Sequence, residues 1–153
     1  MTKNKKRKLE VSLATRIATE HLSYRSLIEE IEADLERVRA ATDSIEDLVG
    51  LLRSFYSHVR GHFALEEKGG LFEVYREHDL ALHHHAAIMM RQHADFLERL
   101  RRILAALETL DRSDGPQFEQ CSSDLRRIFR ELRAHEQAED ALLERLVEQD
   151  IGR

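Results

Sequence analysis

The sequence predicts an all-α protein that folds as an up-down-up-down antiparallel four-helix bundle. Leu, Ala, Glu and Arg, which all favour helices, dominate its 153 residues, and only one proline and six glycines interrupt them. Apolar residues recur in alternating steps of three and four along four long segments. Short breaks separate these segments, as in an antiparallel bundle. The length suits a single domain with one core.

The first predicted helix runs from about Val11 to Ala40. We expect residues 1–9, which are rich in lysine, to form a basic mobile tail, and residues 10–150 to form the bundle. The inward positions of this helix carry one histidine among mostly apolar residues: Ile17, His21, Tyr24, Ile28, Ile31, Leu35 and Val38.

The second predicted helix begins after Ser44, which forms a capping-box pattern with Asp47. We expect Gly69 and Gly70 to end it, because glycine tolerates the left-handed conformation found at helix ends. Residues 71–79 read as a short connection that could contain one extra helical turn. The inward positions of the helix are Ile45, Leu48, Leu52, Phe55, Val59, His62 and Glu66.

The third predicted helix runs from about Leu80 to Leu110. A break at Ser113–Pro116 follows, and Pro116 suits the first turn of the fourth helix. The inward positions of the third helix are Leu82, Ala86, Met89, His93, Phe96, Leu100, Ile103 and Leu107. Those of the fourth are Cys121, Leu125, Ile128, Leu132, His135, Glu139, Leu142 and Leu146.

Each predicted helix thus places a histidine where the pattern calls for an apolar residue. In an antiparallel hairpin, residues equally far from the turn lie at one level. The midpoint of His21 and His62 falls between residues 41 and 42, in the first break, and that of His93 and His135 falls at Asp114, in the last. The midpoint of His62 and His93 falls at residues 77–78, inside the second connection. We therefore expect all four histidines at one height in the bundle.

The second and fourth helices add a carboxylate one turn after the histidine, at Glu66 and Glu139. Residues four apart project from the same helical face. Burying six polar groups without partners would be costly, about 1–3 kcal/mol for each and more for a carboxylate. A metal centre removes this cost, since imidazole and carboxylate suit first-row cations. The sequence therefore predicts metal ligands at His21, His62, Glu66, His93, His135 and Glu139.

Each piece also has a simpler interpretation, because a lone inward histidine is commonly a core residue and a lone His-x-x-x-Glu a surface pair. The prediction depends on all six positions agreeing. Glu67 and Glu136 are alternative carboxylate ligands, ranked lower than Glu66 and Glu139. Tyr24 is expected to pack in the core, rather than to donate to a bound oxygen species. The remaining residues are expected to be surface, boundary or core residues: His58, His78, His83, His84, His85, Met89 and Cys121.

With its ordered set of His21, His62-x-x-x-Glu66, His93 and His135-x-x-x-Glu139, the chain resembles the hemerythrin-like (HHE cation-binding) family over about residues 10–150. The resemblance implies two irons bridged by Glu66 and Glu139, with dioxygen or a related small molecule as the ligand. Oxygen-carrying members place two histidines one turn apart on the third helix. Here Met89 and Leu97 flank His93, which favours sensing, oxidant chemistry or iron handling over reversible oxygen carriage.

The leading hypothesis is a cytoplasmic di-iron protein, with Mn or Zn as possible replacements for Fe, that binds or senses dioxygen or another small oxidant. A di-iron or di-manganese oxidase or peroxidase, or an iron store, is the alternative. A third hypothesis, from a different functional class, is a metal-free helical protein that binds a partner protein. The formal net charge of −5 gives no reason to expect nucleic acid. No apolar run approaches the roughly 20 residues of a membrane span, no secretory signal is expected, and the single cysteine suits a reducing compartment.

Overall fold

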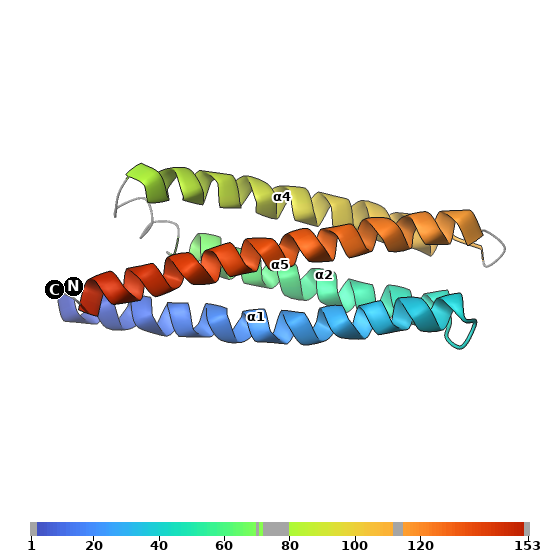
Figure 1. Ribbon diagram of the computed structural model, residues 1–153, viewed down its shortest axis with the longest axis horizontal. Coiled ribbons are helices and arrows are strands. Elements are labelled where there is room, and N and C mark those ends of the chain that lie inside the picture. The colour runs from blue at the N-terminus through green and yellow to red at the C-terminus, as the bar shows by residue number, and fades with distance from the viewer. Residues whose placement is uncertain (1–2, 70, 72–79, 112–114, 152–153) are drawn as a thin grey trace.

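The computed structural model describes residues 3–69, 71, 80–111 and 115–151, with side chains from residue 11 to residue 145 of these ranges. Four long helices account for nearly all of them: α1 (Lys3–Arg39), α2 (Ile45–Lys68), α4 (Leu80–Glu108) and α5 (Gly115–Ile151). Successive helices run in opposite directions, and α5 returns to the end of the bundle where α1 begins (Figure 1). Each helix packs against its two neighbours in the ring α1–α2–α4–α5. The predicted up-down-up-down bundle is confirmed.

The start of α1 differs from the prediction. The helix begins at Lys3, eight residues before the expected start at Val11. Lysine, arginine and leucine are good helix formers, and no proline or glycine interrupts residues 3–10, so the helix continues through the basic segment. The predicted helix start is therefore wrong, while the division into a tail of residues 1–9 and a bundle of residues 10–150 stays a prediction.

The turn between α1 and α2 contains the predicted helix cap. Ser44 has an extended backbone, and its side chain accepts a hydrogen bond from the backbone N–H of Asp47 at 3.1 Å. In a capping box the side chain of Asp47 would accept a hydrogen bond from the backbone N–H of Ser44. Here that N–H donates to Asp43 Oδ1 instead, at 2.8 Å. The prediction of Ser44 as the cap is confirmed.

Gly69 ends α2 without the left-handed conformation that we expected. Its φ of −76° and ψ of −4° are right-handed, and its N–H donates to the carbonyl of Leu65 at 2.7 Å. A Cβ at this position would lie 2.2 Å from the Leu65 carbonyl oxygen, so the need for glycine comes from close backbone approach. Gly70 lies outside the described residues, as do the connection at residues 72–79 and the break at residues 112–114.

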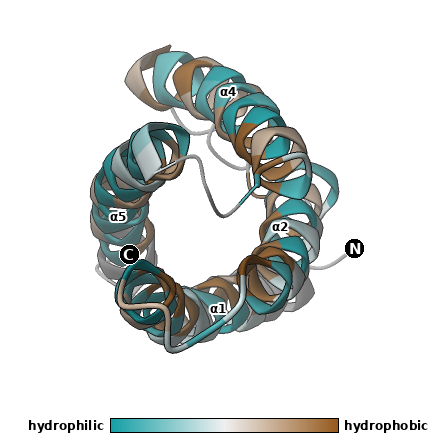
Figure 2. Cartoon of the chain, turned by 90° about the vertical axis from the view of Figure 1, so that its right-hand side faces the viewer, coloured by the Kyte–Doolittle hydropathy of each residue, from teal (hydrophilic) through white to brown (hydrophobic). Residues whose placement is uncertain are grey.

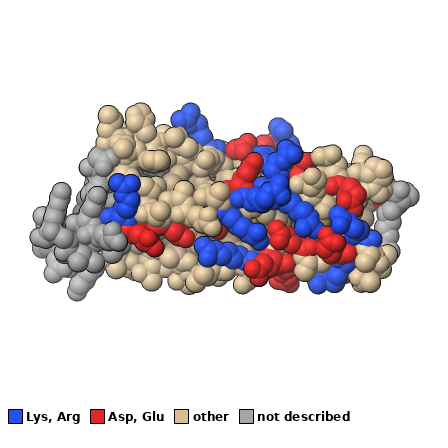
Figure 3. All heavy atoms as spheres, in the orientation of Figure 1, with Lys and Arg blue, Asp and Glu red and all other residues tan. Residues whose placement is uncertain are grey.

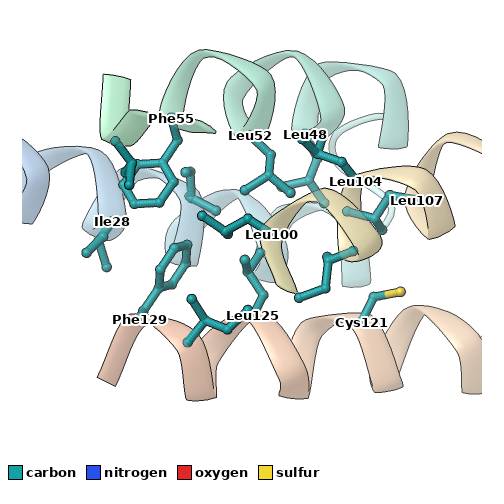
Figure 4. Packing of buried hydrophobic residues seen from close by; sticks show 14 of the residues in the cluster. Ile28, Leu48, Leu52, Phe55, Leu100, Leu104, Leu107, Cys121, Leu125 and Phe129 are labelled. Carbon is teal, nitrogen blue, oxygen red and sulfur yellow. The ribbon is translucent and has the colours of Figure 1, made fainter. Parts of the chain in front are cut away.

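Two apolar clusters fill the bundle at different heights. The larger one lies toward the α1–α2 turn and draws on all four helices (Figure 4). The smaller one lies toward the beginning of α1 and comprises Ile17, Leu71, Ala86, Met89, Leu142 and Leu143. Viewed along the bundle, hydrophobic residues lie largely on the inner sides of the helices (Figure 2). The level between the two clusters is occupied by polar side chains.

Ion pairs join neighbouring helices on the outside of the bundle. Arg39 and Glu119 connect α1 to α5 at 2.7 Å, and Arg53 and Glu108 connect α2 to α4 at 2.7 Å. One face shows interleaved positive and negative side chains toward the end of the bundle that carries the α1–α2 turn, and few charges toward the other end (Figure 3). Exposed pairs of this kind contribute about 0–1 kcal/mol each, so the fold depends mainly on its apolar clusters. Among the described residues, no helix is both long and apolar enough to span a membrane.

One carboxylate, that of Asp34, is buried inside the α1–α2 end of the bundle. Burial and the neighbouring Asp43 carboxyl raise the pKa of Asp34 to about 6, although Arg37 lies 3.0 Å away and opposes the shift. Two neighbouring carboxyls favour a proton on one of them. The folded state therefore holds a proton that an unfolded chain releases near pH 4.

We expect the substitution Asp34→Asn to stabilise the protein near pH 7.5 and to have little effect near pH 4.5. The raised pKa means that the stability contributed by Asp34 is complete below about pH 4 and is lost as pH rises through about 6, whereas an amide keeps its hydrogen bonds throughout. Thermal melts of both proteins across this range provide the measurement. Asp111→Asn, at an exposed position, is the matched control. A difference in melting temperature that does not change with pH would contradict the assignment.

Candidate metal centre

The polar level of the bundle brings together the six predicted residues. His21 comes from α1, His62 and Glu66 from α2, His93 from α4, and His135 and Glu139 from α5, and all six side chains are buried. The Nε2 atoms of His21 and His62 lie 3.1 Å apart, and those of His93 and His135 also lie 3.1 Å apart. The expectation that the four histidines share one height is confirmed.

The six residues form two groups that overlap at both glutamates. One group is His21, His62, Glu66 and Glu139, and the other is His93, His135, Glu66 and Glu139. Within each group, one ligand atom from every residue lies within 4.8 Å of the others. We call these the α1–α2 half and the α4–α5 half, after the helices that supply their histidines. Two imidazole nitrogens and two carboxylate oxygens are thus available in each half.

Each glutamate offers one oxygen to each half. Glu66 Oε1 is in close contact with Nε2 of His62, while its Oε2 lies 3.2 Å from Nε2 of His93. Glu139 Oε1 lies 3.4 Å from Nε2 of His21, and its Oε2 lies 3.4 Å from Nε2 of His135. A carboxylate with this orientation can bridge two cations, and its charge is then shared between them.

The donor set fits a pair of first-row cations. The four oxygens of Glu66 and Glu139 are buried, and no described group donates a hydrogen bond of good geometry to any of them. Buried carboxylate oxygens in this state need a positive charge, either protons on the facing imidazoles or metal ions. Nitrogen and oxygen donors in equal number suit iron, manganese or zinc. The described part of the chain therefore holds a buried His/Glu cluster suitable for a dinuclear metal site.

The outward nitrogen of every imidazole in the cluster has a hydrogen-bond acceptor. Nδ1 of His21 lies 2.7 Å from Asp140, that of His62 2.5 Å from Glu20, and that of His93 3.2 Å from Glu67. Nδ1 of His135 lies 2.6 Å from Oε1 of Gln92. An acceptor at Nδ1 holds the proton there, which leaves Nε2 free to bind a cation and fixes the direction of the ring.

These four acceptors form a closed ring around the bundle, which we call the outer ring. Each helix supplies the acceptor for the histidine of the next helix, in the order α1 to α2, α2 to α4, α4 to α5 and α5 to α1. Our reading of the sequence missed Glu20, Gln92 and Asp140 and considered Glu67 only as an alternative ligand. A signal was present, since Glu20 and Gln92 each precede a histidine by one, and Glu67 and Asp140 each follow one by five.

Aromatic rings support the imidazoles from the side of the larger apolar cluster. Phe63 stacks on His93 with ring centroids 3.8 Å apart, and the Phe96 ring meets His135 edge-on. The Tyr24 ring meets His62 edge-on, while its hydroxyl donates to the carbonyl oxygen of His58 at 3.1 Å. The predicted packing role of Tyr24 is therefore confirmed, because its hydroxyl is engaged by the α2 backbone.

Most of the other singled-out residues lie where we expected them. His58 and the run His83–His85 are exposed, Met89 packs in the smaller apolar cluster, and Cys121 is a buried free cysteine. His78 lies outside the described residues. Glu136 is buried with neither oxygen hydrogen-bonded to a described group, and burial raises its pKa to about 7. It belongs to neither of the two groups of candidate ligands.

In the absence of a cation, protons on the imidazoles balance the two glutamates. Burial opposes a charge on His21, but the nearby carboxylates of Glu139 and Glu66 outweigh it and raise the pKa of His21 to about 11. The pKa of His62 is also raised, since Glu66 and Glu20 overcome the effect of burial. The pKa of Glu66 is lowered well below its usual value, because the neighbouring imidazoles of His21, His62 and His93 outweigh its burial. A cation that enters the cluster would take the place of these protons.

Comparison with models of protein families finds a match to the hemerythrin HHE cation binding domain over residues 12–148. This match covers all six cluster residues and all four acceptors of the outer ring. Comparisons with curated proteins and with solved structures found no match.

We expect the metal-free protein to lose stability as the pH rises from about 7.5 to 9.5. His21 has a folded pKa of about 11 and an ordinary value of 6.5, so its contribution is complete below pH 6.5 and is lost as pH rises toward 11. The substitution His21→Asn should reduce this slope, which thermal melts in the presence of a chelator would measure. His84→Asn, at an exposed position of α4, serves as the control. An undiminished slope in the His21 variant would count against the charge balance described above.

Proposed function

The chain belongs to the hemerythrin HHE cation-binding domain family, and from this premise we propose that it is a non-haem di-iron protein that binds or senses dioxygen or a related small oxidant. The proposed ligands are His21 and His62 for one ion, His93 and His135 for the other, and Glu66 and Glu139 for both. Manganese or zinc would also suit these donors. A cytoplasmic location and a small-oxidant partner are parts of the same proposal.

The observation that carries the proposal is the overlap of two buried ligand groups at both glutamates. A single-ion site would leave two of the four imidazoles without a role, whereas two ions use all six side chains. Four protein atoms per ion are fewer than iron commonly binds, so positions remain for an exogenous ligand. When bound, such a pair of irons supplies reversible electron transfer to or from a small oxidant.

The chain's own residues would prepare this site in three ways. The outer ring holds a proton on each Nδ1 and so directs each Nε2 inward. The two glutamates bring negative charge that two cations need. The two apolar clusters lie on either side of the His/Glu site and exclude bulk water. This strengthens the hydrogen bonds of the outer ring and the attraction between the glutamates and the cations.

The position one turn from His93 bears on the choice between carrier and sensor. The residues one turn before and after His93 are Met89 and Leu97, whose side chains contain no nitrogen and pack in or against the apolar clusters. That half is therefore limited to two imidazoles. This favours sensing or oxidant chemistry over reversible oxygen carriage. An oxidase or peroxidase would use the same cluster and would reveal itself by turnover with peroxide faster than that of free iron.

We expect the protein purified after expression with iron to contain about two metal ions per chain, and the double variant His62→Ala, His135→Ala to contain far less. Elemental analysis measures the content. A chelator should lower the melting temperature of the wild type by at least about 5 °C, because a cation bound only by the folded state stabilises it. The pair His84→Ala, His85→Ala is the control, since both side chains are exposed. Less than one ion per wild-type chain, or a melting temperature unaffected by the chelator, would favour a metal-free interaction protein.

We expect the iron-loaded protein, reduced with dithionite without air, to change its near-ultraviolet and visible absorption when air is admitted. The change should reverse on renewed reduction, because the ions stay bound while their oxidation state alters. Protein loaded with zinc, which has no redox chemistry, is the matched control. An iron-loaded spectrum that is the same before and after air would contradict the proposed reaction with dioxygen but not the metal centre itself.

A further inference from the structure

The two halves of the cluster are related by an approximate twofold repeat in the chain. In the outer ring, Glu20 occupies the position before His21, and Gln92 occupies the position before His93. Their contacts correspond as well, since Glu20 accepts from Nδ1 of His62 at 2.5 Å and Gln92 accepts from Nδ1 of His135 at 2.6 Å. The same repeat pairs Glu67 with Asp140. The repeat therefore breaks at one place in the outer ring, where an amide replaces a carboxylate.

This difference in the outer ring gives the halves unequal charge, and the buried Glu136, which acts on His21 and His62, adds to the inequality. Both imidazoles of the α1–α2 half are backed by carboxylates, at 2.7 Å for Asp140 and 2.5 Å for Glu20. In the α4–α5 half, one imidazole is backed by Glu67 at the longer distance of 3.2 Å and the other by the neutral Gln92. The bridging glutamates serve both halves, so they do not compensate for the difference.

Cations near the outer ring reduce this difference only slightly. Arg25 lies 3.7 Å from Asp140, and Arg16 lies 4.0 Å from Glu20. The side chains of Arg25 and Arg16 are 43% and 67% exposed, so solvent partly screens their charge. The carboxylates, in contrast, contact imidazoles that are almost completely buried. Their effect on a cation at Nε2 is therefore much less screened.

A carboxylate at Nδ1 makes an imidazole a stronger electron donor than a neutral acceptor does, and loss of such an outer partner typically costs about 10–100-fold in metal affinity. We propose that the two metal positions are inequivalent: the α1–α2 half binds its ion first and more tightly, and Gln92 is the residue that weakens the α4–α5 half. This inference rests on the proposed dinuclear centre. It assigns Gln92 a role in setting affinity, because its amide oxygen holds His135 in place as a carboxylate would.

The consequence is an ordered loading of the centre. At limiting metal, the chain holds one ion between His21 and His62, and the second position fills as the concentration rises. An ion of higher charge is favoured in the half with more negative surroundings. The centre can therefore hold two ions of different kind or oxidation state.

Titration of the metal-free protein with Zn²⁺ alone, against a competing chelator, tests this inference. We expect two binding steps that differ in affinity by at least about 10-fold. Gln92→Glu should tighten the weaker step about 10-fold and bring the two together, and the matched variant Glu20→Gln should weaken the stronger step by a similar factor. Both residues lie at the edge of the cluster, and circular dichroism verifies that the variants remain helical. Crystals grown with one equivalent of Zn²⁺ should show anomalous scattering beside His21 and His62.

The different failures can be told apart. If the wild type binds two Zn²⁺ ions with equal affinity, the inequivalence is wrong and the dinuclear centre stands. If Gln92→Glu leaves the weaker step unchanged, the role assigned to Gln92 is wrong, and anomalous scattering beside His93 and His135 at one equivalent would overturn the proposed order of loading. If the wild type binds fewer than two ions at saturation, the proposed centre fails and the inference fails with it.

Discussion

Two buried glutamates, placed between apolar clusters at the centre of a narrow bundle, are the constraint on which the rest of this structure depends. An uncompensated buried charge costs several kcal/mol, a large part of the roughly 5–15 kcal/mol that stabilises a typical domain. Glu66 and Glu139 face each other's histidines, so they cannot escape to solvent without opening the helices. The bundle must therefore hold positive charge at this level, as protons or as metal ions.

The outer ring follows from the same constraint. An imidazole that is to bind a cation at Nε2 must keep its proton at Nδ1, and a buried N–H needs an acceptor. Because each acceptor comes from the neighbouring helix, the ring also fixes the rotation of the four helices relative to one another. Apolar packing sets the distance between helices, while these directed bonds set which faces meet. Metal binding and helix register are thus determined by the same contacts.

Much of this arrangement could be predicted from the sequence, because it depends on spacing. Steps of three and four along each segment identified the buried faces, and equal distances from the turns placed His21, His62, His93 and His135 at one level. The outer ring was harder to predict, since Glu20 and Asp140 are partly exposed and resemble ordinary surface carboxylates on a helix. Their role depends on the rotation of the neighbouring helix, which no pattern within one segment reports. The early start of α1 was missed because residues 3–10 lack an apolar period, although their residue types favour a helix, and the right-handed conformation of Gly69 depends on backbone geometry that residue type does not determine.

The surroundings of the cluster also limit what could react there. Toward one end of the bundle lies the larger apolar cluster, and toward the other lie Ile17, Met89 and Leu142. A charged or bulky substrate would have to displace these packed side chains and lose its hydration, at a cost that grows with its charge. A small, apolar molecule loses little hydration free energy when it crosses an apolar layer. Dioxygen, which is small and apolar, meets this condition, and most charged metabolites do not. The packing of the bundle, independently of the metal, therefore favours a small, uncharged ligand over a large or charged one.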